Sequence, residues 1–170
     1  MGNRERTENS KGVGLLISVL VRYPELSTVN FDPNGRVLKF TFILTKPLEQ
    51  MKFERMRDRF RMSVAAYGDF KNRKPSLIEM ARTDFGDITV LEVQRDVETL
   101  TQEEISLVID IVRDEMGSLL AADRNDNLME EDLLVQEEII EEMLQDVRDC
   151  RQDKNITAFR EEGRVVVFNK

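Results

Sequence analysis

Residues 28–44 read TVNFDPNGRVLKFTFIL, and this stretch decides the fold class. Apolar and polar residues alternate on both sides of its centre, as they do in strands that bury one face. The central Asn34-Gly35 pair supplies residues that accept the positive φ angles of a tight reversal. The stretch therefore predicts an antiparallel β-hairpin between Val29 and Leu44.

Two later stretches repeat this pattern of two strands around a short turn. Residues 77–84 and 88–95 flank Phe85-Gly86-Asp87, and residues 156–160 and 164–168 flank Glu161-Glu162-Gly163. The glycine of the last turn suits the left-handed position of a three-residue loop. The chain is thus expected to contain about six antiparallel strands.

Residues with helical spacing separate the hairpins. Residues 12–23 are apolar almost all round, which predicts a buried helix that Pro24 ends. Their β-branched members also fit a strand, which is the competing interpretation. Residues 47–67 repeat apolar side chains at steps of three and four, so they predict a helix that begins at Pro47 and ends at Gly68.

A capping motif marks the start of the next helix. Because Glu104 follows Thr101 by three residues, the Thr101 hydroxyl is expected to accept from the Glu104 N–H while the Glu104 carboxylate reaches back. The apolar stripe that follows ends near Ala122. A polar connector, residues 123–127, then leads to a helix over residues 128–150, which should fold back antiparallel against the preceding one.

The predicted order of elements is α-ββ-α-ββ-αα-ββ. Each helix has one apolar stripe and each hairpin has one more apolar face, so about four helices should cover antiparallel hairpins in a two-layer α+β sandwich. Residues 11–170 are expected to form a single domain. Residues 1–10 lack an apolar anchor and are expected to form a disordered tail.

The composition narrows the classes of function. The chain of 170 residues has a net charge of −8, no histidine and one cysteine, Cys150. A single cysteine excludes an internal disulfide and cannot by itself make a structural metal site. The longest apolar run, residues 13–21, is shorter than the stretch of about 20 residues that crosses a membrane. We therefore expect an acidic, cytoplasmic protein without a membrane segment or a cofactor.

Charge is distributed unevenly along the chain. Residues 1–83 contain 16 Lys and Arg against 9 Asp and Glu, whereas residues 84–170 contain 9 against 24. The segment 46–74 holds candidate contact residues for RNA phosphates or for an acidic partner: Lys52, Arg55, Arg57, Arg59, Arg61, Lys71, Arg73 and Lys74. The pattern favours a solvated helix surface with local ion pairs, because a net negative chain without interleaved exposed aromatic residues makes a poor polyanion binder.

The helix predicted over residues 128–150 is strongly acidic. Four of its carboxylates are candidate interface residues: Glu137, Glu138, Glu141 and Glu142. Their charge complements that of the segment 46–74, either within one chain or between two chains. Carboxylates four apart also occur in metal-binding bundles, but those sites add histidines, which this chain lacks.

The last predicted strand is the other candidate interface. Residues 164–168 read RVVVF, a short and mainly β-branched stretch. If this strand lies at a sheet edge, Val165, Val166 and Val167 are placed to pair with another chain, which would make the protein a homo-oligomer or bind a protein partner. A plain core strand is the interpretation that the pattern favours.

Motifs that carry chemistry are scarce. Asp123-x-Asn125-x-Asn127 resembles the start of a calcium loop but lacks the later glycine and glutamate. No serine or cysteine stands in a nucleophile motif, and no catalytic, metal or cofactor residue is assigned. The leading hypothesis is a non-catalytic interaction or regulatory protein that self-associates. RNA binding by the segment 46–74 is the first alternative, and an enzyme using Asp and Glu for acid-base chemistry is the second.

Overall fold

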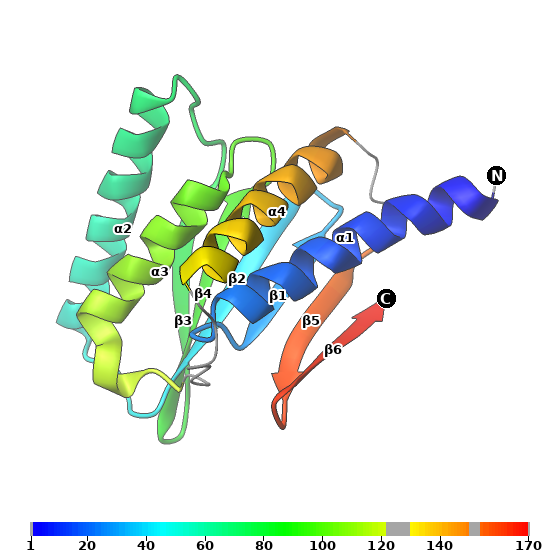
Figure 1. Cartoon of the computed structure of the whole chain (residues 1–170). Coiled ribbons are helices and arrows are strands. Elements are labelled where there is room, and N and C mark those ends of the chain that lie inside the picture. Colours follow the sequence, from blue (N-terminus) through cyan, green and yellow to red (C-terminus); the bar gives the residue numbers. More distant parts are fainter. Residues whose placement is uncertain (1, 122–129, 150–153, 170) are drawn as a thin grey trace.

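A computed structural model describes residues 2–121, 130–149 and 154–169 (Figure 1). Within these residues, four α-helices and a six-stranded antiparallel sheet follow in the order α-ββ-α-ββ-αα-ββ, which confirms the predicted fold class. The helices are α1 (Gly2–Arg22), α2 (Gln50–Phe70), α3 (Gln102–Met116) followed by the 3₁₀ helix η1 (Gly117–Leu119), and α4 (Glu130–Asp149). The strands are β1 (Thr28–Asp32), β2 (Val37–Leu44), β3 (Ile78–Phe85), β4 (Ile88–Asp96), β5 (Ile156–Glu161) and β6 (Arg164–Asn169).

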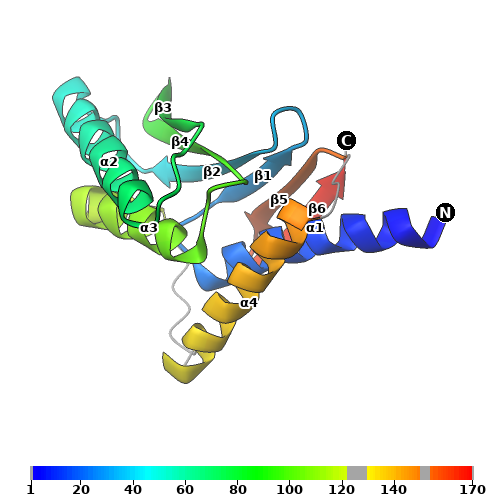
Figure 2. The same cartoon turned by 90° about the horizontal axis from the view of Figure 1, so that it is seen from above.

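All three hairpins join in one sheet, with the strand order β3-β4-β2-β1-β5-β6. Figures 1 and 2 show the helices on one face of this sheet, so the molecule has the two layers that the amphipathic patterns predict. None of the helices in the described residues covers the opposite face of the sheet (Figures 1 and 2). β3 and β6 form the two edges of the sheet.

The core lies between the sheet and the helices. Every second residue of β2 is buried, beginning at Leu38, and the residues between them are half-buried. Phe31 and Phe42 from the sheet and Phe60 from α2 are at most 1% exposed. Because the buried side chains come from both layers, tertiary packing rather than helix propensity stabilises the helices.

The first hairpin turn differs from the expected conformation. Positive φ occurs at Gly35 (84°) and Arg36 (55°), so the prediction that Asn34 takes this conformation is wrong. Asn34 instead donates its N–H to the Asp32 carboxylate at 2.9 Å, a local bond that shifts the reversal by one residue. The Arg36 guanidinium donates to the Val147 carbonyl in the last turn of α4 (2.9 Å), which gives its uncommon backbone conformation a tertiary partner.

The last hairpin has a two-residue loop, not the expected three-residue loop. Glu161 pairs with Arg164 in the ladder, and the loop residues Glu162 and Gly163 have φ angles of 49° and 77°. Positive φ at both central positions is the requirement of a type I′ turn, whose twist matches that of the flanking strands. The loop therefore aligns β5 and β6 without a bulge.

Several helices begin or end at residues other than those predicted from the spacing of apolar residues. α1 confirms the helix that was predicted for residues 12–23 and contradicts the strand alternative. This helix already begins at Gly2. The disorder expected for residues 1–10 stays a prediction. α2 continues past Gly68 to Phe70. A Cβ at Gly68 would lie 2.5 Å from the Arg73 carbonyl oxygen, so this glycine permits the close return of the chain rather than ending the helix. α3 ends at Met116 instead of near residue 122.

α4 packs chiefly against α1 and less against α3, so the expected pairing of the two consecutive helices is only a secondary contact. Arg22 of α1 pairs with Glu137 of α4 at 2.7 Å. A Cβ on Gly14 would lie 3.3 Å from the Met143 side chain. The missing side chain at Gly14 thus allows the close approach of α4 to α1.

Candidate functional site

β6 is an edge strand, hydrogen-bonded to β5 on one side and to no described strand on the other. Val165 and Val167 lie on the helix-covered face and pack partly against the core. The residues between and beyond them lie on the uncovered face, where Phe168 is 49% exposed. Phe168 packs edge-on against Phe159 of β5, with ring centroids 5.8 Å apart. The predicted interface valines are therefore at the rim of the sheet, not in its centre.

The strand register shows which residues of β6 direct their backbone N–H and C=O groups away from β5. Arg160 of β5 donates its N–H to Ser27 beyond β1 (3.1 Å), so the Arg160 backbone groups face away from β6. In an antiparallel ladder neighbouring residues point their N–H and C=O groups to opposite sides. Arg160 is opposite Val165 in the register, and consequently Val165 and Val167 direct their N–H and C=O groups outward, away from the sheet.

The two edges of the sheet carry different side chains. β3 contains three charged residues among its eight: Glu79, Arg82 and Asp84. β6 contains one, Arg164 at its first position, followed by three valines. Because charges on an edge strand oppose pairing with another chain, β3 is protected and β6 is not.

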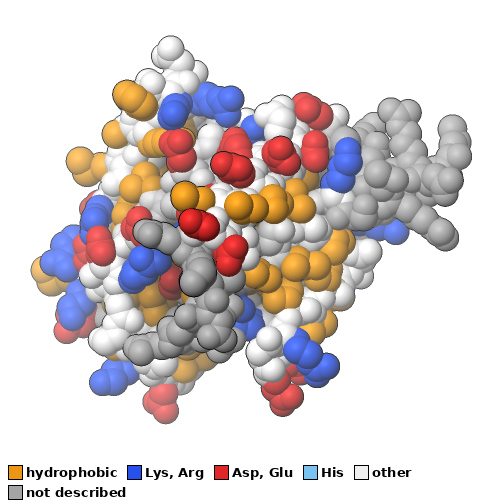
Figure 3. Space-filling model, in the orientation of Figure 1, with side chains coloured by type: hydrophobic (Ala, Val, Ile, Leu, Met, Phe, Trp, Pro, Cys, Tyr) orange, Lys and Arg blue, Asp and Glu red, His pale blue; other side chains and the backbone are white. Residues whose placement is uncertain are grey.

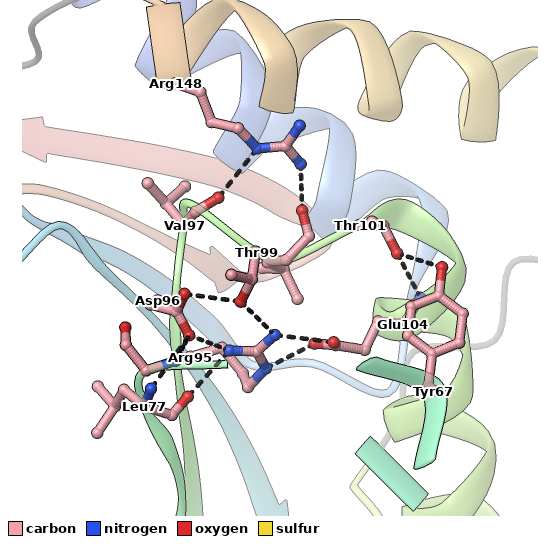
Figure 4. A network of polar contacts seen from close by, with 11 residues as sticks. Tyr67, Leu77, Arg95, Asp96, Val97, Thr99, Thr101, Glu104 and Arg148 are labelled. Carbon is pink, nitrogen blue, oxygen red and sulfur yellow. Dashed lines mark hydrogen bonds and ion pairs between the residues drawn. The ribbon is translucent and has the colours of Figure 1, made fainter. Parts of the chain in front are cut away.

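A buried ionic cluster lies between β4 and α3 (Figure 4). The Arg95 guanidinium donates to both Glu104 carboxylate oxygens, at 2.6 and 2.8 Å, and also pairs with Asp96. The side chains of Arg95 and Glu104 are 0% and 1% exposed. Burial raises the pKa of Glu104, and the hydrogen bond and charge of Arg95 offset part of that rise. Burial also acts to raise the pKa of Asp96. The hydrogen bond from Thr99 and the positive charge of Arg95 outweigh this effect and together hold the Asp96 pKa below its ordinary value.

This cluster corrects half of the capping-box prediction. Thr101 accepts from the Glu104 N–H at 3.2 Å as predicted, but the Glu104 carboxylate is directed to Arg95 instead of back to the Thr101 N–H. Sequence reasoning missed Arg95, although it continues the alternation of the buried residues Leu91 and Val93 along β4. Because its charges are paired inside the chain and closed to solvent, the cluster joins β4 to α3 and offers no binding surface.

A cleft of about 470 Å³ lies between the end of α2, the start of α3 and the middle of α4. It brings together predicted contact residues from both charged segments: Lys71, Arg73, Glu137, Glu138 and Glu141. Three of these residues, Lys71, Glu137 and Glu141, make polar contacts within the helix layer. Glu141 accepts the Gln102 N–H at the start of α3 (2.8 Å), which caps that helix, and Lys71 approaches Glu103 to 3.8 Å. Glu142 lies outside the cleft and is exposed.

Basic side chains of α2 form ion pairs with acidic residues of α3, not of α4, among the described residues. Arg55 pairs with Glu115 at 2.9 Å, and Arg59 pairs with Glu115 and with Asp114 at 3.1 and 3.3 Å. Arg57 instead lies over the Phe53 ring, 5.4 Å from its centroid. Among the described residues no ion pair joins α2 to α4, so the alternative that these two charged segments attract each other within one chain gains no support, and their attraction between two chains stays a prediction. The remaining predicted contact residues of the basic segment are exposed: Lys52, Arg61, Arg73 and Lys74.

Glu115 provides a prediction for the pH dependence of stability. The hydrogen bond from Arg55 is the largest cause that lowers the pKa of Glu115; partial burial opposes it, and Arg59 lowers the pKa further. A carboxyl group with a lowered pKa stabilises the fold above its unfolded-state pKa, and that contribution is lost as the pH falls through the folded-state pKa. We therefore expect the free-energy difference between the native protein and E115Q, measured by urea unfolding, to shrink over this acid range. A difference that stays constant across it would contradict the assignment.

Comparisons with protein-family models, curated proteins and solved structures gave no match to this chain. None of the helices in residues 2–121 and 130–149 combines the length and the apolar character that crossing a membrane requires. In the described part of the chain, no group of three or more Asp, Glu or Cys side chains is placed to hold a metal ion. The calcium-loop resemblance at residues 123–127 and Cys150 lie outside the described residues.

Proposed function

We propose that this protein is a non-catalytic interaction module that extends its sheet by pairing β6 with a strand of a protein partner. The observation that carries the proposal is the outward row of N–H and C=O groups at Val165 and Val167, on an edge strand whose described residues after Arg164, up to Asn169, are uncharged. Main-chain hydrogen bonds supply the affinity in this kind of recognition, and alternate side chains supply the specificity. A cytoplasmic location stays a prediction from the cysteine content.

The side chains next to this edge suit a strand partner. On the uncovered face, Val166 lies opposite Phe159 in the register, next to the exposed ring of Phe168. On the other face, Val165 and Val167 continue the apolar layer of the core to the rim. An added strand with β-branched residues would thus meet apolar neighbours on both faces.

The two alternative functions have less support from the geometry. For RNA binding, Arg55 and Arg59 are already paired with carboxylates of α3, and the basic surface is interrupted by Glu54 and Asp58. For an enzyme with Asp and Glu chemistry, the cleft carboxylates Glu137 and Glu141 serve structural contacts. Neither alternative is proposed further.

A selection experiment tests the proposed function. Peptides from a displayed random library, selected on the native protein, should contain alternating β-branched residues and should lose binding to V167P. Proline at this outward position removes the exposed N–H without removing a hydrogen bond to β5. V167A, which also loses the valine side chain but keeps the N–H, is the matched control and should retain binding. Equal binding of the selected peptides to V167P and V167A would refute the proposal, and so would the absence of strand-like peptides in a selection at concentrations where the chain is monomeric.

A further inference from the structure

The geometry points to a second copy of this chain as the strand partner of β6, paired antiparallel about a twofold axis. This inference rests on the proposed function and adds the identity of the partner. A strand that pairs with its own copy makes an isologous contact, which closes as a dimer and leaves β3 as the outer edge of each half. The two sheets would then form one continuous sheet with the two helix layers on the same face.

The outward backbone groups define the register of this dimer. Because Val165 and Val167 present N–H and C=O groups to the outside, an axis through Val166 places Val165 opposite Val167 of the second copy. Val165 of one copy and Val167 of the other then form two N–H···O=C hydrogen bonds with each other. The symmetry-related pair, Val167 of the first copy and Val165 of the second, forms two more. Val166 faces its own copy in a non-hydrogen-bonded pair. All three valines consequently lie opposite valines, and cross-strand β-branched pairs stabilise a sheet.

α1 supplies a second contact on the helix side of the same junction. Val13, Ile17 and Val21 recur every four residues; Val13 and Ile17 are half-buried, with Val13 packed partly against the core, and Val21 is 37% exposed. α4 contacts the flank of α1 that carries Gly14 and Arg22. At about 100° per residue, the stripe of Val13, Ile17 and Val21 lies on the other flank of α1.

The flank of α1 opposite to α4 is directed toward the edge of the sheet that β6 forms. Figure 1 shows α4 on one side of α1 and β5 and β6 on the other, and Figure 2 shows α1 continuing beyond the sheet edge. In Figure 3 an area of hydrophobic side chains lies beside α1 on the side of β5 and β6. A twofold axis at β6 would bring the two α1 helices together across the junction. The second copy would thus cover the apolar stripe and the free strand edge at once.

Disulfide trapping tests the register. In a C150S background, V166C carries the only thiol of the chain. Non-hydrogen-bonded pairs have Cα atoms about 4.5 Å apart, within the range that a disulfide spans. V90C, at a half-buried position of β4 on the uncovered face, is the matched control. We expect V166C to form on the order of tenfold more covalent dimer than V90C under mild oxidation, because pairing raises the local thiol concentration.

Light scattering across a range of concentrations supplies a second readout that needs no new thiol. The native protein and V167A should be dimers, whereas V167P should be a monomer with an unchanged circular dichroism spectrum. A monomeric native protein, or equal trapping of V166C and V90C, would overturn the inference. The peptide selection described above judges the proposed function separately, since a monomer that still selects strand peptides through Val167 keeps that function while excluding the second copy.

Discussion

Replacing Glu104 by alanine is expected to destabilise the protein by about 3–5 kcal/mol, since removal of one partner leaves a buried charge without compensation. The Arg95 guanidinium is fully buried and donates two hydrogen bonds to the Glu104 carboxylate. Asp96 alone would remain as its anionic partner. Urea unfolding followed by circular dichroism measures the change in the free energy of unfolding.

Two variants control this experiment. E103A removes the neighbouring carboxylate, whose side chain is 66% exposed, and should change stability by no more than about 1 kcal/mol. The double variant R95M/E104M replaces the pair by apolar side chains of similar length and should be more stable than E104A. Asp96 keeps its hydrogen bonds from the Thr99 hydroxyl and from the Ser76 and Leu77 N–H groups in that variant. An E104A protein as stable as E103A would show that the ionic cluster does not stabilise the junction of β4 and α3.

Replacing Phe60 by alanine is expected to destabilise the protein by about 3–5 kcal/mol through lost burial and the cavity that remains. Phe60 is 0% exposed and lies on the face of α2 that packs into the core. Phe70, on the same helix, is 82% exposed, so F70A is the matched control and should change stability by about 0.5 kcal/mol or less. Thermal and urea unfolding both report the difference. A similar effect of the two substitutions would mean that the α2 face assigned to the core is wrong.

The strands and helices whose apolar residues recur at a regular spacing were predictable, because this spacing is visible within a short stretch of sequence. Alternation in residues 28–44 and the three-to-four spacing in residues 47–67 report which side of each element is buried, and a strand or helix needs no distant partner to show it. The Thr101 cap was predictable for the same reason, since it satisfies a donor three residues away. The turn at Glu162-Gly163 was recognised as a turn, but its length depends on the register of the ladder.

The candidate site was predictable only in part. Val165, Val166 and Val167 stood out by their β-branched run, but a strand at an edge and a strand in the core have the same local pattern. The acidic partners of Arg55 and Arg59 on α3 were not foreseen, because charge complementarity does not say which helix is the neighbour. Arg95 was missed because an isolated charged residue in a strand is usually exposed.

By itself, the sequence determined the three hairpins, the helices between and after them, their order, and the two-layer α+β class, because these depend on periodicities within about ten residues. It left residues 12–23 open between a helix and a strand. Only the tertiary structure decided that the hairpins form one sheet, that β6 is its unprotected edge, that α4 packs on α1, and that Arg95 joins Glu104. These features depend on contacts between residues far apart in the chain, and such contacts form where backbone hydrogen bonds and side-chain volumes are satisfied together. The edge that carries the proposed function belongs to this second group.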